Sequence, residues 1–308
     1  MSVTPPLFYS PFSAKLLSFL LQESSNYDVA IFLGEASGVY VAQVSSPIVI
    51  WDKANVFTAF CINSVKNLKS LPQKIKFSFN LALSFFYERR VLGHCDHVWV
   101  TSPEEGRRLE TYFSRTPDAV VRSSIQHPVS NPEKFAANSR SLVWMSTFAY
   151  PPNWDGLRRL VEEAQGIFTS NGLRLTVVGV GASENQVSYL GRFHFIDYVG
   201  YVEDLDEVFS ESLAGIVPIW AGAGVKLKTI TMMSRGLPVL STFAGMEGVP
   251  LDAALCVSDS PRDLLRAVLD KPSEELRQAS ARAFNMIVEN FSEASFEQAV
   301  GREMAILK

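Results

Sequence analysis

The chain has 308 residues, of which 47% are hydrophobic, and a formal net charge of −4. This length suits about two domains, and 28 basic against 32 acidic residues exclude the basic footprint of a nucleic-acid-binding protein. Charged residues make up only 19%, which excludes a disordered chain and favours buried sheets.

Targeting signals are lacking in the sequence as it stands. No apolar run reaches the roughly 18 residues of a membrane-spanning helix, and the opening MSVTPPLFYSPF has neither the basic start nor the apolar stretch of a signal peptide. Cys61, Cys95 and Cys256 are odd in number and widely spaced, so no disulfide framework is expected. We therefore predict a cytoplasmic protein, with a membrane-associated one as the alternative.

The first part of the chain, residues 1–130, alternates short apolar runs with helical patterns. Strands are predicted to begin at Asp28, Pro47, His97 and Val120. This alternation is typical of a mostly parallel sheet with flanking helices. We expect a Rossmann-like domain here.

A long helix is predicted between the second and third of these strands, from Gln73 in QKIKFSFNLALSFFYERRVL. Ile75, Phe79, Leu83 and Phe86 recur on one face, which is expected to pack into the core. The aromatic content and the flanking basic residues leave a peripheral membrane contact as the alternative. Those basic residues are Lys74, Lys76, Arg89 and Arg90.

His94, Cys95, Asp96 and His97 form a cluster of metal-ligand types just before the third strand. Neighbouring side chains of a strand point to opposite faces, so these residues are not expected to close around one ion. We predict no metal site.

A polar stretch with two prolines, HPVSNPEKFAANSR, suits a linker to a second domain at residues 140–295, followed by a helical tail at 296–308. Five strands are predicted in this domain, beginning with LVWMST, LRLTVV, FHFIDYVGYV, AGIVPIW and LPVLST. Ligands of such doubly wound sheets bind beyond the carboxyl ends of the strands. The residues expected there are Thr147, Gly179, Gly181, Tyr201, Trp220 and Thr242.

The most informative stretch, WAGAGVKLKTITMMSRGLPVLST, starts at Trp220. Gly222 and Gly224 lack Cβ atoms where a ligand can approach the backbone, and a helix from about residue 225 aims free N–H groups at an anion. Lys226 and Lys228 add positive charge. The stretch predicts a phosphate-binding turn, and a plain strand-to-helix turn with two solvated lysines is the alternative.

Several motifs, taken in order, resemble the donor-binding domain of retaining glycosyltransferases of family four, which have the GT-B fold. They are STFAYPPNWDGLRRLVEE, LRLTVVGVG, YVGYVEDLDEVFSESLAGIVPI, GAGVKLK and SRGLPVLSTFAGMEGV. The resemblance implies an α/β protein with two Rossmann-like doubly wound domains facing a cleft, the N-terminal one shortened.

The resemblance also implies an activity: transfer of a sugar, with retention, from a nucleoside-diphosphate sugar to an unknown acceptor hydroxyl in polysaccharide or glycoconjugate biosynthesis. The nucleotide sugar is the donor substrate, and no cofactor or metal is expected. Lys226 and Lys228 fall where the family neutralises the diphosphate, and such preorganised cations stabilise the charge of the leaving group. They are the expected catalytic residues.

Donor-binding positions follow by the same resemblance. Tyr201 and Val202 match the segment that meets the base, and 245–247 the loop near the sugar. Glu203 and Asp204 fit a solvated helix start equally well. The full expected donor set is Thr147, Phe148, Asn153, Gly179, Tyr201, Val202, Gly222, Ala223, Gly224, Val225, Thr231, Gly245, Met246 and Glu247.

Three departures from the family are visible. Thr231 stands where the family has a ribose-binding glutamate, and Ala223 replaces another glutamate. The usual first strands also have no obvious counterpart, which favours a homo-oligomer or a companion chain. Glu35, Asp52 and Asn55 are the acceptor-side candidates.

Two other functions stay open. One is a glycosyltransferase-like partner or regulatory subunit without turnover, which Thr231 and the short first domain favour. The other is a nucleotide-sugar epimerase, which needs acid and base carboxylates around the sugar.

Overall fold

The computed structural model describes residues 12–44, 46–67, 71–125, 135–222 and 224–307. The chain divides into two compact units. The first comprises Met1–Arg122, Gly222–Val225 and Ala299–Lys308, and the second comprises Ser123–Ala221 and Lys226–Gln298.

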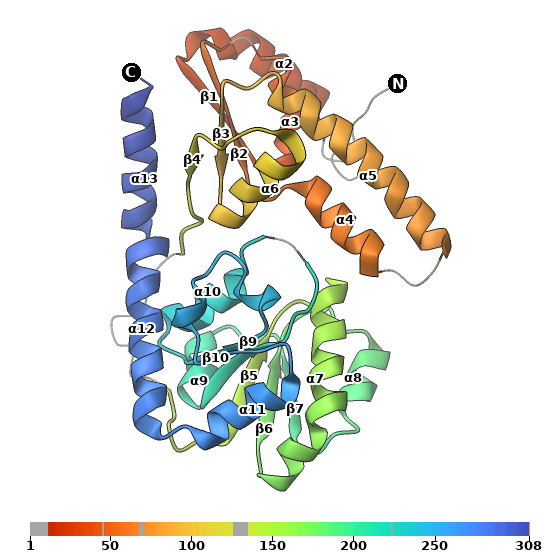
Figure 1. The fold of residues 1–308 in the computed structure, drawn as a ribbon, viewed down its shortest axis with the longest axis vertical. Helices are drawn as coiled ribbons and strands as arrows, with labels where there is room; N and C mark the ends of the chain where they lie inside the picture. Colours follow the sequence, from red (N-terminus) through yellow and green to blue (C-terminus); the bar gives the residue numbers. More distant parts are fainter. Residues whose placement is uncertain (1–11, 45, 68–70, 126–134, 223, 308) are drawn as a thin grey trace. The chain divides into compact units, whose positions relative to one another are not determined.

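The first unit contains a four-stranded parallel sheet in the order β1-β2-β3-β4 (Figure 1). All four predicted strands form: β1 (Val29–Leu33), β2 (Ile48–Lys53), β3 (His97–Val100) and the short β4 (Ala119–Val120). The helices of this unit are α2 (Ala14–Glu23), α3 (Gly34–Val41), α4 (Phe57–Asn67), α5 (Leu71–Leu92) and α6 (Pro103–Phe113), and η1 (Ser24–Asn26) is a 3₁₀ turn.

The core of this unit lies on both faces of β2, which is why its sequence IVIW is continuously apolar. Trp51 packs on one face against Tyr40 of α3 and Tyr87 of α5. Ile50 and Trp99 pack on the other face. There they are covered by residues from the end of the chain, including Val300 of α13 (Glu293–Ile306).

A buried ion pair ties the helices to the sheet. Lys53, at the end of β2, places its Nζ 2.6 Å from Glu88 Oε1 of α5, and both side chains are fully buried. Glu88 also accepts hydrogen bonds from the backbone N–H groups of Phe57 (2.9 Å) and Thr58 (2.8 Å) at the start of α4. One carboxylate therefore fixes β2, α4 and α5 together.

The prediction for the face of α5 is wrong. Ile75, Phe79 and Phe86, expected in the core, are 65%, 64% and 57% exposed. The helix is apolar on two sides, and its buried side is formed by Ser84, Tyr87, Glu88 and Val91. Packing on that second side leaves the predicted face outside.

The second unit contains a six-stranded sheet in the order β10-β9-β8-β5-β6-β7, in which every pairing is parallel. The five predicted strands appear as β5 (Ser141–Met145), β6 (Arg174–Val178), β7 (Ile196–Gly200), β8 (Ala214–Val217) and β9 (Val239–Ser241), and β10 (Cys256–Val257) is additional. The chain runs outward from β5 in one direction, returns to β8 and continues in the other. This is a doubly wound sheet with its switch point between β5 and β8.

Helices flank this sheet (Figure 1). They are α7 (Pro151–Ser170), α8 (Glu184–Leu190), α9 (Leu205–Ser210), α10 (Leu227–Ser234), α11 (Pro261–Asp270) and α12 (Ser273–Phe291), with 3₁₀ turns η2 (Ala244–Met246) and η3 (Leu251–Ala253). In the part of the chain that the structure describes, no helix combines the length and apolarity that crossing a bilayer requires.

Candidate functional site

The candidate site of the second unit is the carboxyl edge of its sheet. Because all neighbouring strands are parallel, their carboxyl ends meet at one edge. The segments beginning at Ser146, Gly179 and Tyr201 leave β5, β6 and β7 there. Trp220 and Thr242 follow β8 and β9 at the same edge, as predicted.

Lys228 lies in the first turn of α10 and reaches the segment after β5. Its Nζ lies 2.6 Å from Ser146 Oγ and 2.6 Å from Asn153 Oδ1. Asn153 is itself held, since its Nδ2 donates to the backbone oxygen of Thr147 at 2.8 Å. The ammonium group therefore has neutral acceptors, and among the described residues it forms no ion pair.

This environment perturbs the lysine strongly. Burial, and then the nearby charge of Lys226, lower the pKa of Lys228 to about 7. A desolvated cation without a counter-charge favours an anion that can approach it. Lys228 is therefore the side chain at this edge that is best prepared to meet a negative group.

Lys226 immediately precedes α10 and has a different surrounding. Its Nζ lies 3.2 Å from Glu247 Oε2, and the two side chains are only 8% and 9% exposed. Glu247 follows η2, so the predicted diphosphate lysine and a residue of the predicted sugar loop are paired with each other. A bound diphosphate would have to share Lys226 with this carboxylate.

The glycine loop before α10 has the backbone that the sequence predicts. Gly222 and Gly224 have φ angles of 134° and 78°, which side-chain-bearing residues rarely adopt. No side chain caps the start of α10 in the described structure. The N–H of Thr229 donates to the backbone oxygen of Lys226 at 2.9 Å, so the N–H groups before Thr229 are the ones that an anion can approach. Val225 is half-buried, and Ala223 lies outside the described residues.

Two other predicted glycines have a packing role. A Cβ atom on Gly179 would lie 1.9 Å from the backbone oxygen of Ser146, and one on Gly245 would lie 2.3 Å from Ser241 Oγ. Both positions require glycine for close approach of neighbouring segments, whether or not a ligand binds.

The remaining predicted donor residues divide into buried and accessible ones. Phe148 and Met246 are buried, at 4% and 1% exposure, so they shape the edge from beneath. Tyr201 is 74% exposed, while Thr147 is exposed and Thr231 half-buried. Val202 is half-buried beside Tyr201.

Of the two acidic residues that follow Val202, Asp204 stands at the start of a helix. Asp204 caps α9, because its carboxylate accepts from the backbone N–H of Asp206 at 2.8 Å. Sequence reasoning missed Ser146, although its place directly after β5 and beside Thr147 was a usable signal.

The acceptor-side candidates lie together in the first unit. Glu35, in the first turn of α3, accepts a hydrogen bond from the backbone N–H of Asn55. Burial, and then the charge of Glu35, raise the pKa of Asp52 to about 6. Asp52 Oδ1 and Asn55 Oδ1 are buried and lack a hydrogen-bond partner among the described residues. Buried polar atoms without a partner are rare in folded proteins, so this cluster is a candidate ligand site.

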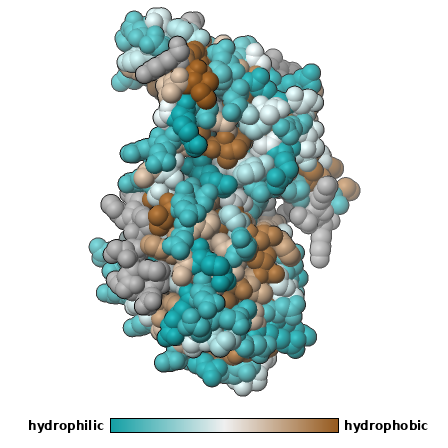
Figure 2. Space-filling view, turned by 60° about the vertical axis from the view of Figure 1, so that its left-hand side comes forward, coloured by the Kyte–Doolittle hydropathy of each residue, from teal (hydrophilic) through white to brown (hydrophobic). Residues whose placement is uncertain are grey.

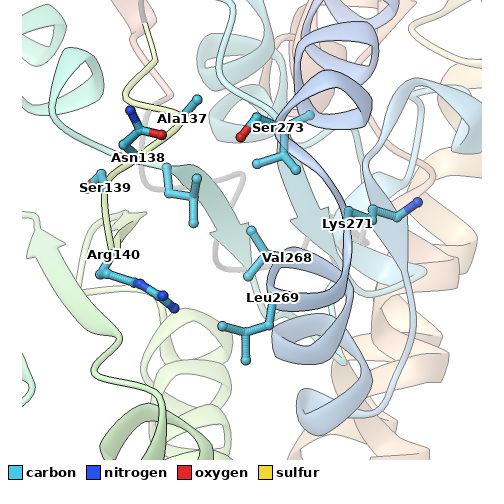
Figure 3. A pocket seen from close by; sticks show the side chains of 10 residues that line it. Ala137, Asn138, Ser139, Arg140, Val268, Leu269, Lys271 and Ser273 are labelled. Atoms are coloured by element: carbon cyan, nitrogen blue, oxygen red, sulfur yellow. The ribbon is translucent and has the colours of Figure 1, made fainter.

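A cavity of about 270 Å³ lies elsewhere in the second unit, as Figure 3 shows. Its lining includes Arg140 and Leu213, which directly precede β5 and β8, so it opens at the amino edge of the sheet. Lys271 points away from it (Figure 3) and pairs with Glu275 at 2.7 Å. The cavity is separate from the site around Lys226 and Lys228.

Comparison with known proteins gives a family match for part of the chain and structural likenesses for nearly all of it. Residues 139–271 match the family model of the Glycosyl transferases group 1. The matched segment includes Lys226 and Lys228. No curated protein sequence matches the chain significantly.

Solved structures of GT-B glycosyltransferases resemble the whole chain at low sequence identity. TarM, known from S. aureus, has a TM-score of 0.72 at 13% identity; the alignment covers 95% of this chain and 57% of TarM. Anabaena HepE with UDP-glucose has a TM-score of 0.67 at 12% identity and coverages of 94% and 82%. The α,α-trehalose 6-phosphate synthase of Burkholderia multivorans has a TM-score of 0.62 at 12% identity, and the alignment covers 98% of this chain and 80% of the synthase. The fold is that of the GT-B glycosyltransferases. This likeness and the two parallel sheets confirm the predicted α/β class. The chain spans little more than half of TarM.

Proposed function

We propose that this chain is a retaining glycosyltransferase that binds a nucleoside-diphosphate sugar at the carboxyl edge of the second sheet and transfers the sugar, of hexosyl type, to an acceptor hydroxyl. The observation that carries the proposal is Lys228, a half-buried ammonium with neutral acceptors beside Lys226 at the start of α10. The family match over this segment supports it.

The chemistry requires positive charge at this place. When the glycosidic bond to the donor breaks, the leaving diphosphate gains negative charge, and interactions that strengthen with that charge lower the barrier. Lys228 is poorly solvated, so its attraction to the leaving group is weakly screened. The helix start and Lys226 act on the same group, while Glu247 holds Lys226 in place.

The nucleotide and sugar occupy the accessible residues of this edge in our proposal. Tyr201 and Val202 meet the base, and Glu247 with the backbone of Gly245 lies near the sugar. Thr231 offers the ribose one hydroxyl group, whereas a carboxylate can accept from two hydroxyls. HepE has been solved with UDP-glucose, so a uridine diphosphate sugar is the first donor to test.

In this proposal, Glu35, Asp52 and Asn55 bind the acceptor hydroxyl. Asp52 has a pKa of about 6, so it is mostly ionised at neutral pH and able to accept a hydrogen bond from a hydroxyl group.

A noncatalytic partner or regulatory subunit is the second candidate, and two observations favour it. Thr231 lacks the carboxylate expected at the ribose, and Lys226 is already paired with Glu247. Such a protein would bind a nucleotide sugar without turning it over.

Product analysis tests the proposal. The full chain is incubated with UDP-glucose and other nucleotide sugars, with a panel of small-molecule, lipid-linked and protein acceptors, and the anomeric configuration of the product is read by NMR. We expect transfer with the donor's configuration kept, abolished in Lys228→Met and unchanged in Lys271→Met, whose lysine lies at the opposite edge of the same sheet. Binding without transfer supports the second candidate, and an inverted product contradicts retention.

A further inference from the structure

The outward face of α5 carries a row of large apolar side chains. Leu71, Ile75, Phe79 and Phe86 are 70%, 65%, 64% and 57% exposed. Their spacing of four, four and seven residues places them along one side of the helix. We call these four residues the α5 stripe. Elsewhere, the face shown in Figure 2 is mostly hydrophilic, with apolar residues gathered in patches.

The α5 stripe is held outward by the opposite side of the helix. Glu88 pairs with Lys53 at 2.6 Å inside the unit. Tyr87 is buried and donates its hydroxyl to the backbone oxygen of Glu35 at 2.7 Å. Turning the stripe inward would break the ion pair and expose these groups, so the fold cannot hide the stripe by rotating α5.

The sequence around the α5 stripe is rich in basic residues and poor in acidic ones. Residues 57–92, which span α4 and α5, contain six lysines and arginines and a single acidic residue, Glu88, although the whole chain has a net charge of −4. Glu88 is buried in its ion pair, whereas Arg89 and Arg90 are exposed. Among the side chains of α4 and α5 that the structure describes, the exposed charges are therefore positive.

We propose that the α5 stripe docks on an anionic lipid surface, with α5 lying in the interface and the arginines meeting the lipid headgroups. An apolar row with basic neighbours matches both requirements of interfacial binding, namely apolar burial and attraction to anionic lipid. A second copy of the chain fits this face less well, because two such hairpins would bring like charges together. This docking is independent of the proposed sugar transfer.

Vesicle flotation of the full chain tests the proposal. The protein is mixed with phosphatidylcholine vesicles, with or without phosphatidylglycerol. We expect flotation with the anionic vesicles only, and a loss at high salt. Arg89→Gln with Arg90→Gln should weaken binding about fivefold per arginine. Ile75→Ser with Phe79→Ser should weaken it by at least about tenfold.

Matched variants in the second unit serve as controls. Val187→Ser with Leu251→Ser removes exposed apolar groups (38% and 49% exposed), and Arg277→Gln with Arg282→Gln removes exposed arginines. Both should float like the parent protein. Thermal unfolding shows whether each variant is folded, and nucleotide binding should persist in all of them.

Two results would overturn the proposal. One is absence of flotation, or flotation that the α5 variants leave unchanged. The other is a concentration-dependent dimer that Ile75→Ser with Phe79→Ser disrupts, because the stripe would then be an interface between copies. Neither result depends on whether the donor site binds nucleotides.

Discussion

Lys228 changes its protonation state at neutral pH, because burial and Lys226 lower its pKa to about 7. A diphosphate beside it favours the charged form and must raise that pKa. Above pH 7 the free protein holds this lysine mostly neutral, so binding of a nucleoside diphosphate should take up a proton there, and affinity should fall as the pH rises from 7 to 9.

Titration calorimetry at pH 8, in buffers with different ionisation enthalpies, measures this proton uptake. We predict an uptake approaching about one proton per nucleotide in the parent protein. Lys271→Met should behave like the parent. Binding with no uptake at pH 8 would mean that Lys228 does not contact the diphosphate.

Thr231 provides a second test at the scale of a residue. If the ribose lies against this part of α10, Thr231→Glu supplies a carboxylate for its hydroxyls and should tighten nucleotide binding by about 1.5–3 kcal/mol. Thr231→Gln tests whether the charge is needed. Unchanged or weaker binding of Thr231→Glu would place the ribose elsewhere.

Among the elements, α5 depends on one internal contact. Glu88→Ala leaves Lys53 as an uncompensated buried charge and removes the acceptor at the start of α4. We expect a loss of about 3–5 kcal/mol in the free energy of unfolding, measured by urea denaturation. Glu110→Ala, which removes an exposed glutamate of α6, should change it by less than about 0.5 kcal/mol. A small effect of Glu88→Ala would contradict the structural importance of the pair.

The elements also show what sequence can and cannot predict. Strands such as β2 and β8 could be predicted from the sequence, because strands of a parallel sheet are covered on both faces and are therefore continuously apolar. The exposed side of α5 was not, since the helix has apolar residues on both sides and only tertiary packing selects the inner one. β10 has two residues and no pattern to detect.

The candidate site was predictable to a similar extent. The turn from Gly222 to Lys228 is local, so its glycines and lysines could be identified in the sequence. Asn153 and Glu247 were in the expected donor set, but their pairing with the lysines could not be predicted. Ser146 and Asn153 lie 82 and 75 positions from Lys228, and no local pattern indicates that Glu247 pairs with Lys226. Strand order decides which distant segments meet at the edge.

For the whole molecule, the likeness to TarM at 13% identity shows how little sequence the fold requires. Buried patterning and the order of strands define the two sheets, whereas the proposed sugar transfer depends on a few side chains at the sheet edges. The proposed function therefore depends on whether those side chains bind a nucleotide.

The most direct test of that claim is calorimetric titration of the full chain with a panel of nucleoside diphosphates. We predict saturable binding of one of them, weakened by about 1.5–3 kcal/mol in Lys228→Met and unchanged in Lys271→Met. If no nucleoside diphosphate bound, or if Lys228→Met bound as tightly as the parent protein, the carboxyl edge of the second sheet would not be a donor site.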